Sequence, residues 1–154
     1  MNILLIRGPA NNKAIDLSHY TFSEPLGLQM LYSVLSEENS VEIFDMLADK
    51  TTLEKKLNEK QFDFCGISSA CSDIFMIKDL ARKIKKIKDI PIFIGGYQVK
   101  KTPELFKSRH IDFIMVAHQK KTPSSQHKPH ANDVMSLGKE IFNELVFMDY
   151  FDAY

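Results

Sequence analysis

A short apolar run that stops abruptly at two glycines constrains the fold of this chain more than any other segment. It spans Ile90–Gln98 and reads I-P-I-F-I-G-G-Y-Q. An unbroken apolar run of this length is typical of a strand buried on both faces of a parallel sheet. Because glycine has no Cβ atom, Gly95 and Gly96 allow a bulky group to lie against the backbone. In open α/β sheets, ligands bind at this end of the strands.

Apolar strand-like runs alternate with amphipathic helical segments along most of the sequence. Strands are expected at Asn2–Ile6, Val41–Asp45, Phe62–Ile67, Ile92–Ile94 and Phe113–Val116. Helices are expected at Leu26–Glu38, Leu53–Lys60, Ser72–Lys88 and Thr102–Lys107. Strands joined by helices of this size form parallel sheets with right-handed crossovers. The pattern therefore predicts an α/β, three-layer Rossmann-like (flavodoxin-like) fold with a five-stranded parallel sheet in the order 2-1-3-4-5.

Two long connections interrupt this alternation and divide the chain. One runs from Arg7 to Pro25 and leaves the first strand on the ligand side of the sheet. The other, 118–132, has no large apolar residue and is expected to be a linker or mobile loop between a domain at 1–117 and a C-terminal helix at 133–154. The helical spacing there comes from Val134, Leu137, Ile141, Leu145 and Met148.

Composition limits the partners and the compartment. The chain has 154 residues, enough for one domain, and 20 basic residues balance 20 acidic ones. Zero net charge predicts no nucleic-acid partner, and the lack of a long apolar run predicts no membrane span. With two cysteines and no export signal, a cytoplasmic location is expected.

The residues after the first strand match neither common phosphate-binding motif. They read Arg7-Gly8-Pro9-Ala10, without the glycine spacing of a dinucleotide fold or a P-loop. A phosphoacceptor receiver domain is also disfavoured, because it would place acids after the first strand and an aspartate at the end of the third. Asp45 ends the second strand, where a ribose-binding acid would lie, but without the glycine pattern it is interpreted as a strand-end acid that faces water.

No metal site and no catalytic set emerges from the histidines and cysteines. His127-x-x-His130 has no further ligands at zinc spacing, and Cys65 with Cys71 forms a C-x5-C pair that neither a zinc ribbon nor an iron–sulfur site uses alone. Cys65 is expected to be a buried strand residue. Cys71 lies at a helix start, where a thiolate could be stabilised, so catalysis through Cys71 or His19 is a weaker alternative.

Small residues follow three strands whose ends are expected to meet at one edge of the sheet. They are Gly8-Pro9, Ser68-Ser69-Ala70 and Gly95-Gly96. Small residues on adjacent loops can form the floor of a site for a flat or bulky ligand. Serine hydroxyls there could donate to a polar part of that ligand.

Several segments, in their order along the chain, resemble those of a known family. They are Asn2–Ile6 with Gly8-Pro9, Glu24-Pro25-Leu26-Gly27-Leu28, Val41–Asp45, Phe62–Ser69 and Ile90–Gly96, with Asp112-Phe113-Ile114 closing the set. Together they are similar to the cobalamin-binding domain found at the N-terminus of many radical SAM enzymes. The resemblance covers about residues 1–117.

The resemblance implies a corrin ring on the carboxyl edge of the sheet and a nucleotide tail in a slot between strands. The loops after the third and fourth strands would flank that tail, and the segment 24–27 would shape the lower face near the ring. The implied cofactor-binding residues are Gly8, Pro9, Glu24, Pro25, Gly27, Ser68, Ser69, Gly95, Gly96 and Tyr97. The family's D-x-H-x-x-G motif is absent, so no histidine ligand to cobalt is expected, with His19 as the alternative.

Two departures from the family limit the expected function. Val116-Ala117-His118-Gln119 replaces a Gly-Glu pair, and no C-x3-C-x2-C motif is present for an iron–sulfur cluster. The chain is therefore expected to bind and present cobalamin without completing a reaction, beside a separate catalytic domain or a homodimer partner. The alternative is a ligand-free interaction or regulatory module whose last helix docks a partner. That helix carries Phe142, Leu145, Phe147, Phe151 and Tyr154.

Overall fold

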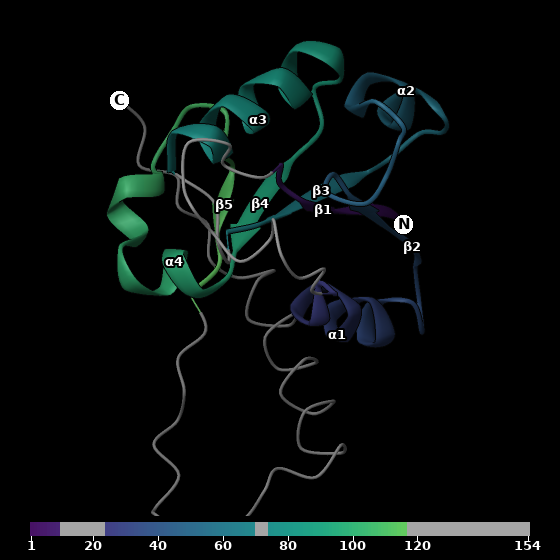
Figure 1. The fold of residues 1–154 in the computed structure, drawn as a ribbon, viewed down its shortest axis with the longest axis horizontal. Coiled ribbons are helices and arrows are strands. Elements are labelled where there is room, and N and C mark those ends of the chain that lie inside the picture. Colours follow the sequence, from purple (N-terminus) through teal and green to yellow (C-terminus); the bar gives the residue numbers. More distant parts are fainter. Residues whose placement is uncertain (10–23, 70–73, 117–154) are drawn as a thin grey trace, which may run out of the picture.

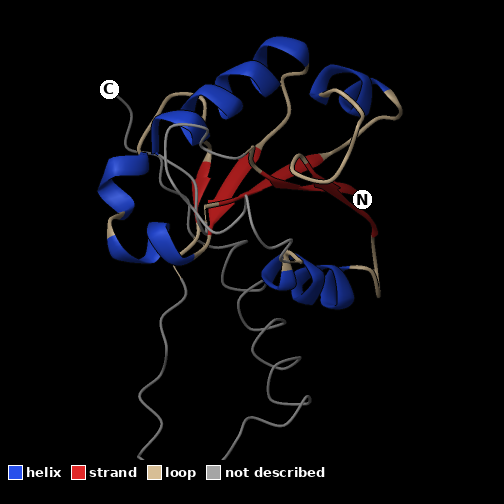
Figure 2. Ribbon diagram, in the orientation of Figure 1, coloured by secondary structure: helices blue, strands red, loops and turns tan. Residues whose placement is uncertain are grey.

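A computed structural model describes residues 1–9, 24–69 and 74–116, which form a parallel sheet with helices on both faces (Figures 1 and 2). The strands are β1 (Asn2–Arg7), β2 (Ser40–Asp45), β3 (Phe64–Ser68), β4 (Ile92–Gly95) and β5 (Phe113–Ile114). All neighbouring strands pair in parallel, and the five-stranded order is β2-β1-β3-β4-β5. The expected α/β fold and strand order are therefore confirmed.

The helices differ from the expected ones mainly at their ends. They are α1 (Leu26–Leu35), α2 (Leu53–Asn58), α3 (Ile74–Ile87), α4 (Tyr97–Lys101) and the 3-10 helix η2 (Pro103–Phe106). Helix α1 ends before Glu38 because Asn39 donates to the Leu35 carbonyl from both its backbone nitrogen and its side-chain amide. Helix α4 was not expected from the sequence, because five residues are too few to show a helical repeat.

Strand β3 begins at Phe64 rather than at Phe62. Asp63 precedes it and forms two hydrogen bonds with Asn2 at the start of β1. Its backbone nitrogen donates to the Asn2 carbonyl at 2.8 Å, and its carboxylate accepts from the Asn2 nitrogen at 2.7 Å. Phe62 is nevertheless fully buried, so this apolar residue packs in the core without belonging to the strand.

Two hydrophobic clusters cover the two faces of the sheet. On one face, Leu4 and Ile6 of β1 pack with residues of α3, α4 and η2 in the larger cluster. On the other face, Ile3 and Leu5 pack with residues of β2 and α1. Alternate residues of β1 thus enter opposite cores, which explains its uninterrupted apolar run. Figure 1 shows α2 and α3 on one side of the sheet and α1 on the other.

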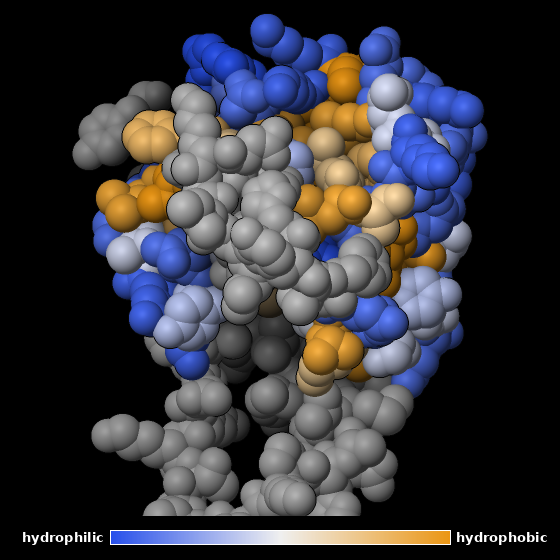
Figure 3. Space-filling view, in the orientation of Figure 1, coloured by the Kyte–Doolittle hydropathy of each residue, from blue (hydrophilic) through white to orange (hydrophobic). Residues whose placement is uncertain are grey.

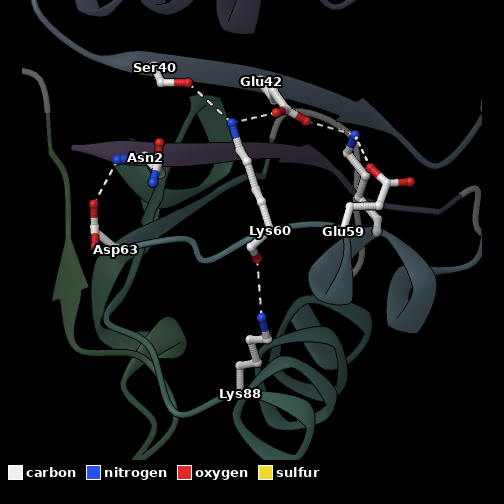
Figure 4. A network of polar contacts seen from close by, with 8 residues as sticks. Asn2, Ser40, Glu42, Glu59, Lys60, Asp63 and Lys88 are labelled. Atoms are coloured by element: carbon white, nitrogen blue, oxygen red, sulfur yellow. Dashed lines mark hydrogen bonds and ion pairs between the residues drawn. The ribbon is translucent and has the colours of Figure 1, made fainter.

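A polar network ties α2 to the edge strand β2 (Figure 4). Glu42 of β2 forms ion pairs with Lys56 and Lys60, and Lys60 also donates to the Ser40 hydroxyl at 3.1 Å. Lys88, just after α3, donates to the Lys60 carbonyl at 3.1 Å. These contacts hold the segment after α2 between the outer strand and the end of α3.

Some sequence-based expectations fall outside the described residues. They include the loop 118–132, the C-terminal helix 133–154 and the start of the third expected helix at Ser72. Within the part of the chain that the structure describes, no helix is long and apolar enough to span a bilayer.

Candidate functional site

The strand ends that carry the small residues lie side by side at the carboxyl edge of the sheet. Arg7 of β1 pairs with Asp45 of β2 on one side and with Ser68 of β3 on the other. Ser68 in turn pairs with Gly95 of β4. The backbone that follows these positions therefore leaves the sheet from adjacent strands, as the carboxyl ends of parallel strands must. We refer to this region as the carboxyl edge.

Ser69 links the backbone segments that follow β3 and β4. Its backbone nitrogen and its hydroxyl both donate to the Gly95 carbonyl, at 2.8 and 2.9 Å. The Val99 nitrogen in α4 donates to the same hydroxyl at 3.4 Å. Ser69 is fully buried, and its hydroxyl hydrogen points at Gly95 rather than at a ligand. Its observed part is to position the β3 and β4 exits and the start of α4.

Gly96 has the one backbone conformation among the described residues that favours glycine. Its φ angle is 117°, which side chains of L-residues rarely adopt. The residue is exposed and precedes α4, and its carbonyl accepts from the Lys100 nitrogen at 3.1 Å. Glycine is therefore favoured here by the backbone conformation between β4 and α4. Tyr97 follows with 61% of its surface exposed.

Gly95 is not required by packing in the same way. A Cβ atom there would meet the Met115 side chain at 3.5 Å, which is an ordinary contact. On the neighbouring exits, Ser68 and Pro9 are half-buried, whereas Gly8 is buried directly after β1. The expected small residues thus line the carboxyl edge, but a backbone reason for glycine is found at Gly96 and not at Gly95.

Helix α1 brings the next expected site residues to the same edge. Its last turn lies at the opposite edge, since Asn39 accepts from the Met1 amino group and Ser40 donates to the Met1 carbonyl. Its first turn, about 15 Å away along ten residues, therefore points toward the carboxyl edge. The Pro25 carbonyl accepts from the Leu28 and Gln29 nitrogens and starts the helix.

Gly27 in this first turn has no packing reason within the described residues. A Cβ atom there would meet nothing within 4 Å, and the residue is exposed. A helical glycine costs about 1 kcal/mol relative to alanine. Leu26 beside it is 66% exposed, and Glu24 accepts from the Gln29 amide at 3.1 Å. The first turn of α1 thus presents bare backbone and an apolar side chain outward.

Arg7 and Asp45 form an ion pair that the sequence analysis missed. The Arg7 Nη1 atom lies 3.2 Å from the Asp45 Oδ2 atom, and the other carboxylate oxygen accepts from the Leu47 nitrogen at 3.0 Å. The expectation that Asp45 faces water was wrong, because the residue is buried against its neighbouring strand. Both residues end adjacent strands at paired positions, and this register was the signal that could have revealed the pair.

The described residues at this edge offer no cluster of metal ligands. Among residues 1–9, 24–69 and 74–116, no three His, Cys, Asp or Glu side chains lie together as a metal site would require. Cys65 is fully buried in β3, and burial raises the pKa of its thiol far above the usual range. A buried neutral thiol is unreactive. Cys71, His19, His127 and His130 lie outside the described residues.

The surface carries apolar patches among charged regions (Figure 3). Exposed apolar side chains occur in the first turns of three helices that start at the carboxyl edge. They are Leu26 of α1, Phe75 of α3 and Tyr97 of α4. An edge of bare backbone bordered by apolar side chains suits a large, partly apolar ligand or a protein surface.

Comparison with known proteins gives two matches. Residues 13–124 match the B12 binding domain family, a span that contains α1 and the ends of β3 and β4. A protein of Pyrococcus horikoshii named as an uncharacterized methyltransferase is 34% identical over 109 residues. This similarity covers 68% of the present chain and 24% of the relative, so the chain spans about a quarter of the curated relative's length.

Proposed function

The chain belongs to the B12 binding domain family, and from this membership we propose that it holds a cobalamin-type corrinoid on the carboxyl edge of its sheet. The observation that carries the proposal is the coincidence of two facts. The family match spans α1 to β5, and the turns within that span leave backbone without side chains at one edge. The resemblance to cobalamin-binding domains drawn from the sequence is thereby confirmed at the level of the family.

The residues at the edge fit such a ligand in their steric character. Open space over Gly27 would admit a flat macrocycle, and the exposed Gly96 turn would let amide side arms approach the backbone. The remaining expected contacts are Gly8, Pro9, Glu24, Pro25, Ser68, Gly95 and Tyr97, with Ser69 as the residue that positions them. A bound corrinoid supplies a cobalt centre that carries alkyl groups, while the chain would orient it and limit its access to water.

The second part of the proposal is that this chain presents the corrinoid to a catalytic unit and completes no reaction itself. The relative that it resembles is named a methyltransferase and is about four times as long as the match. A radical SAM unit would need a C-x3-C-x2-C motif, and none occurs in these 154 residues. Such a unit would therefore lie elsewhere, in another domain or another chain.

A ligand-free interaction module is the second candidate function. The exposed Leu26 and Tyr97 side chains support it, because they could pack on a partner protein as well as on a corrin ring. Under this alternative the edge would bind protein directly and would retain no corrinoid.

Retention of hydroxocobalamin tests the proposal and separates the two candidates. Purified protein is mixed with hydroxocobalamin, desalted and examined for corrin absorbance in the visible range. We expect coloured protein from the wild type and colourless protein from Gly27→Leu, since a Cβ atom there meets nothing within 4 Å and the rest of the leucine would take up space proposed for the ring. Ser33→Leu is the matched control, because Ser33 is exposed on the same helix but about 9 Å farther along it.

The outcomes lead to different conclusions. A colourless wild-type protein would contradict corrinoid binding and favour the interaction module. A coloured wild type with an equally coloured Gly27→Leu variant would keep the corrinoid but remove the first turn of α1 from its site. Loss of colour in Ser33→Leu as well would mean that any added leucine on α1 disturbs the protein.

A further inference from the structure

On the α1 face of the sheet, the side chains of β3 and β4 change from very small to aromatic within two residues of the carboxyl edge. Ser68 and Gly95 form the first pair at the edge. The next pair on the same face is Gly66 with Phe93. A Cβ atom at Gly66 would lie 2.3 Å from the Cζ atom of Phe93, so the Phe93 ring lies over the neighbouring strand. The ring takes the space that a side chain at position 66 would fill.

Other side chains near Phe93 on the same face are also aromatic. Phe113 is the β5 partner of Phe93, and Phe64 lies at the start of β3. The centroids of the Phe64 and Phe113 rings are 6.5 Å apart. We call Phe64, Phe93 and Phe113 the aromatic layer. Phe64 and Phe93 are partly buried and pack against the cluster formed by α1, β1 and β2.

A ligand group that enters from the edge along β3 and β4 must use this face. The opposite face is filled by the large core cluster, in which Cys65, Ile67, Ile92 and Ile94 are fully buried. Over β1 and β2, the α1 face is covered by Leu28 and Leu35 of α1. A ligand group would therefore enter beside the small first pair, Ser68 and Gly95, next to the Met115 side chain that borders Gly95. The Phe93 ring lies directly behind that pair.

The available depth follows from strand geometry. Ser68 and Gly66 are two residues apart, which corresponds to about 7 Å along a strand. A group that enters beside Ser68 thus meets the Phe93 ring after about that length. The benzimidazole nucleotide of a cobalamin is longer than this, whereas the short amide arms of a corrin ring are not.

We propose that Phe93 limits how deeply a ligand can enter, so that this chain selects corrinoids by the corrin ring rather than by the nucleotide tail. This inference rests on the proposed corrinoid binding and narrows its ligand class. The chain accepts corrinoids without a nucleotide, such as cobinamide, about as well as complete cobalamins. Phe93 is therefore a specificity-determining residue, and replacing it with a shorter side chain opens room for the tail.

Affinities for cobinamide and hydroxocobalamin, measured by equilibrium dialysis with absorbance detection, test this inference. For the wild type we expect dissociation constants within about threefold of each other, a difference below 1 kcal/mol. For Phe93→Leu we expect cobalamin to bind about tenfold more tightly, equivalent to about 1.4 kcal/mol, with cobinamide unchanged. Phe113→Leu is the matched control, because Phe113 pairs with Phe93 on the same face but lies two strands away from Gly66. It should move neither affinity.

Cobinamide binding also reports on folding, because a variant that keeps its cobinamide affinity has kept the edge. A wild type that already prefers cobalamin by far more than threefold would overturn the inference, and so would a Phe93→Leu variant with an unchanged or weakened preference. In those cases corrinoid binding itself would stand. If the wild type bound neither corrinoid, the proposed function would fall and this inference with it.

Discussion

The Phe93 side chain fills the space next to Gly66 on the neighbouring strand. In Gly66→Ala the new Cβ atom would lie 2.3 Å from Phe93 Cζ and 3.0 Å from Leu5 Cδ2. Both side chains pack in the hydrophobic cluster on that face, so moving either of them would weaken that packing. We expect the free energy of unfolding to fall by about 1–3 kcal/mol, as for other overpacked cores. Urea denaturation monitored by circular dichroism measures the change.

Two companion variants make this result specific. Gly27→Ala places the same methyl group in open space on a helix, so it should raise stability by up to about 1 kcal/mol. The double variant Gly66→Ala/Phe93→Leu should recover part of the lost stability, because leucine is shorter than phenylalanine and leaves room for the new methyl group. Equal effects of Gly66→Ala and Gly27→Ala would show that the Phe93 ring does not occupy the space over Gly66.

The contact between β2 and α2 depends on the charge of one glutamate. Hydrogen bonds from Lys56 and then Lys60 lower the pKa of Glu42 below its ordinary value of 4.5. A carboxylate with a lowered pKa in the folded state contributes stability that is present above its unfolded pKa and is lost as the pH falls through the folded value. Glu42→Gln should therefore reduce the unfolding free energy at pH 7, and the deficit should shrink as the pH falls below 4.5.

The size of this effect is modest because solvent reaches the pair. About a third of the Glu42 side chain is exposed, so we expect a loss below about 1 kcal/mol. Glu59→Gln is a suitable comparison, since Glu59 contacts only Lys56 in this network and is more exposed. Denaturation curves at pH 7 and pH 3 should show a larger pH-dependent deficit for Glu42→Gln than for Glu59→Gln. A deficit of equal size at both pH values would contradict the assignment.

Secondary structure was predictable from the sequence where the pattern of apolar residues alone determined it. The fully apolar runs of β1 and β4 indicated buried strands, and their alternation with helices predicted a parallel sheet. The order of the strands was only suggested by analogy with other five-stranded folds, and the structure confirms it. Helix α4 was missed because it depends on the Gly96 turn and spans too few residues for a repeat. The early end of α1 was missed because it depends on the Asn39 side chain.

The candidate site was predictable in place but not in detail. That Gly8, Ser68 and Gly95 would lie at one edge follows from parallel pairing alone. The hydrogen bond from Ser69 to Gly95 and the Arg7–Asp45 pair depend on strand register, which a single sequence does not give. The Phe93 ring over Gly66 likewise requires coordinates, because the sequence shows only a glycine and a phenylalanine on separate strands.

Corrinoid binding should be visible in the stability of the whole domain, because a ligand that binds only the folded state shifts the unfolding equilibrium. At a free hydroxocobalamin concentration of about 100 times its Kd, the gain is about 2.7 kcal/mol. For a domain of this size each kcal/mol raises Tm by about 2–4 °C, so far-UV circular dichroism should show a shift of about 5–10 °C. If Phe93 excludes the nucleotide, cobinamide at the same free concentration should give a similar shift, because the two dissociation constants are then similar. Gly27→Leu should show no shift with either compound. An unchanged wild-type Tm would mean that this member of the family does not bind the corrinoid. The exposed apolar residues at the carboxyl edge would then have to be explained by a protein partner.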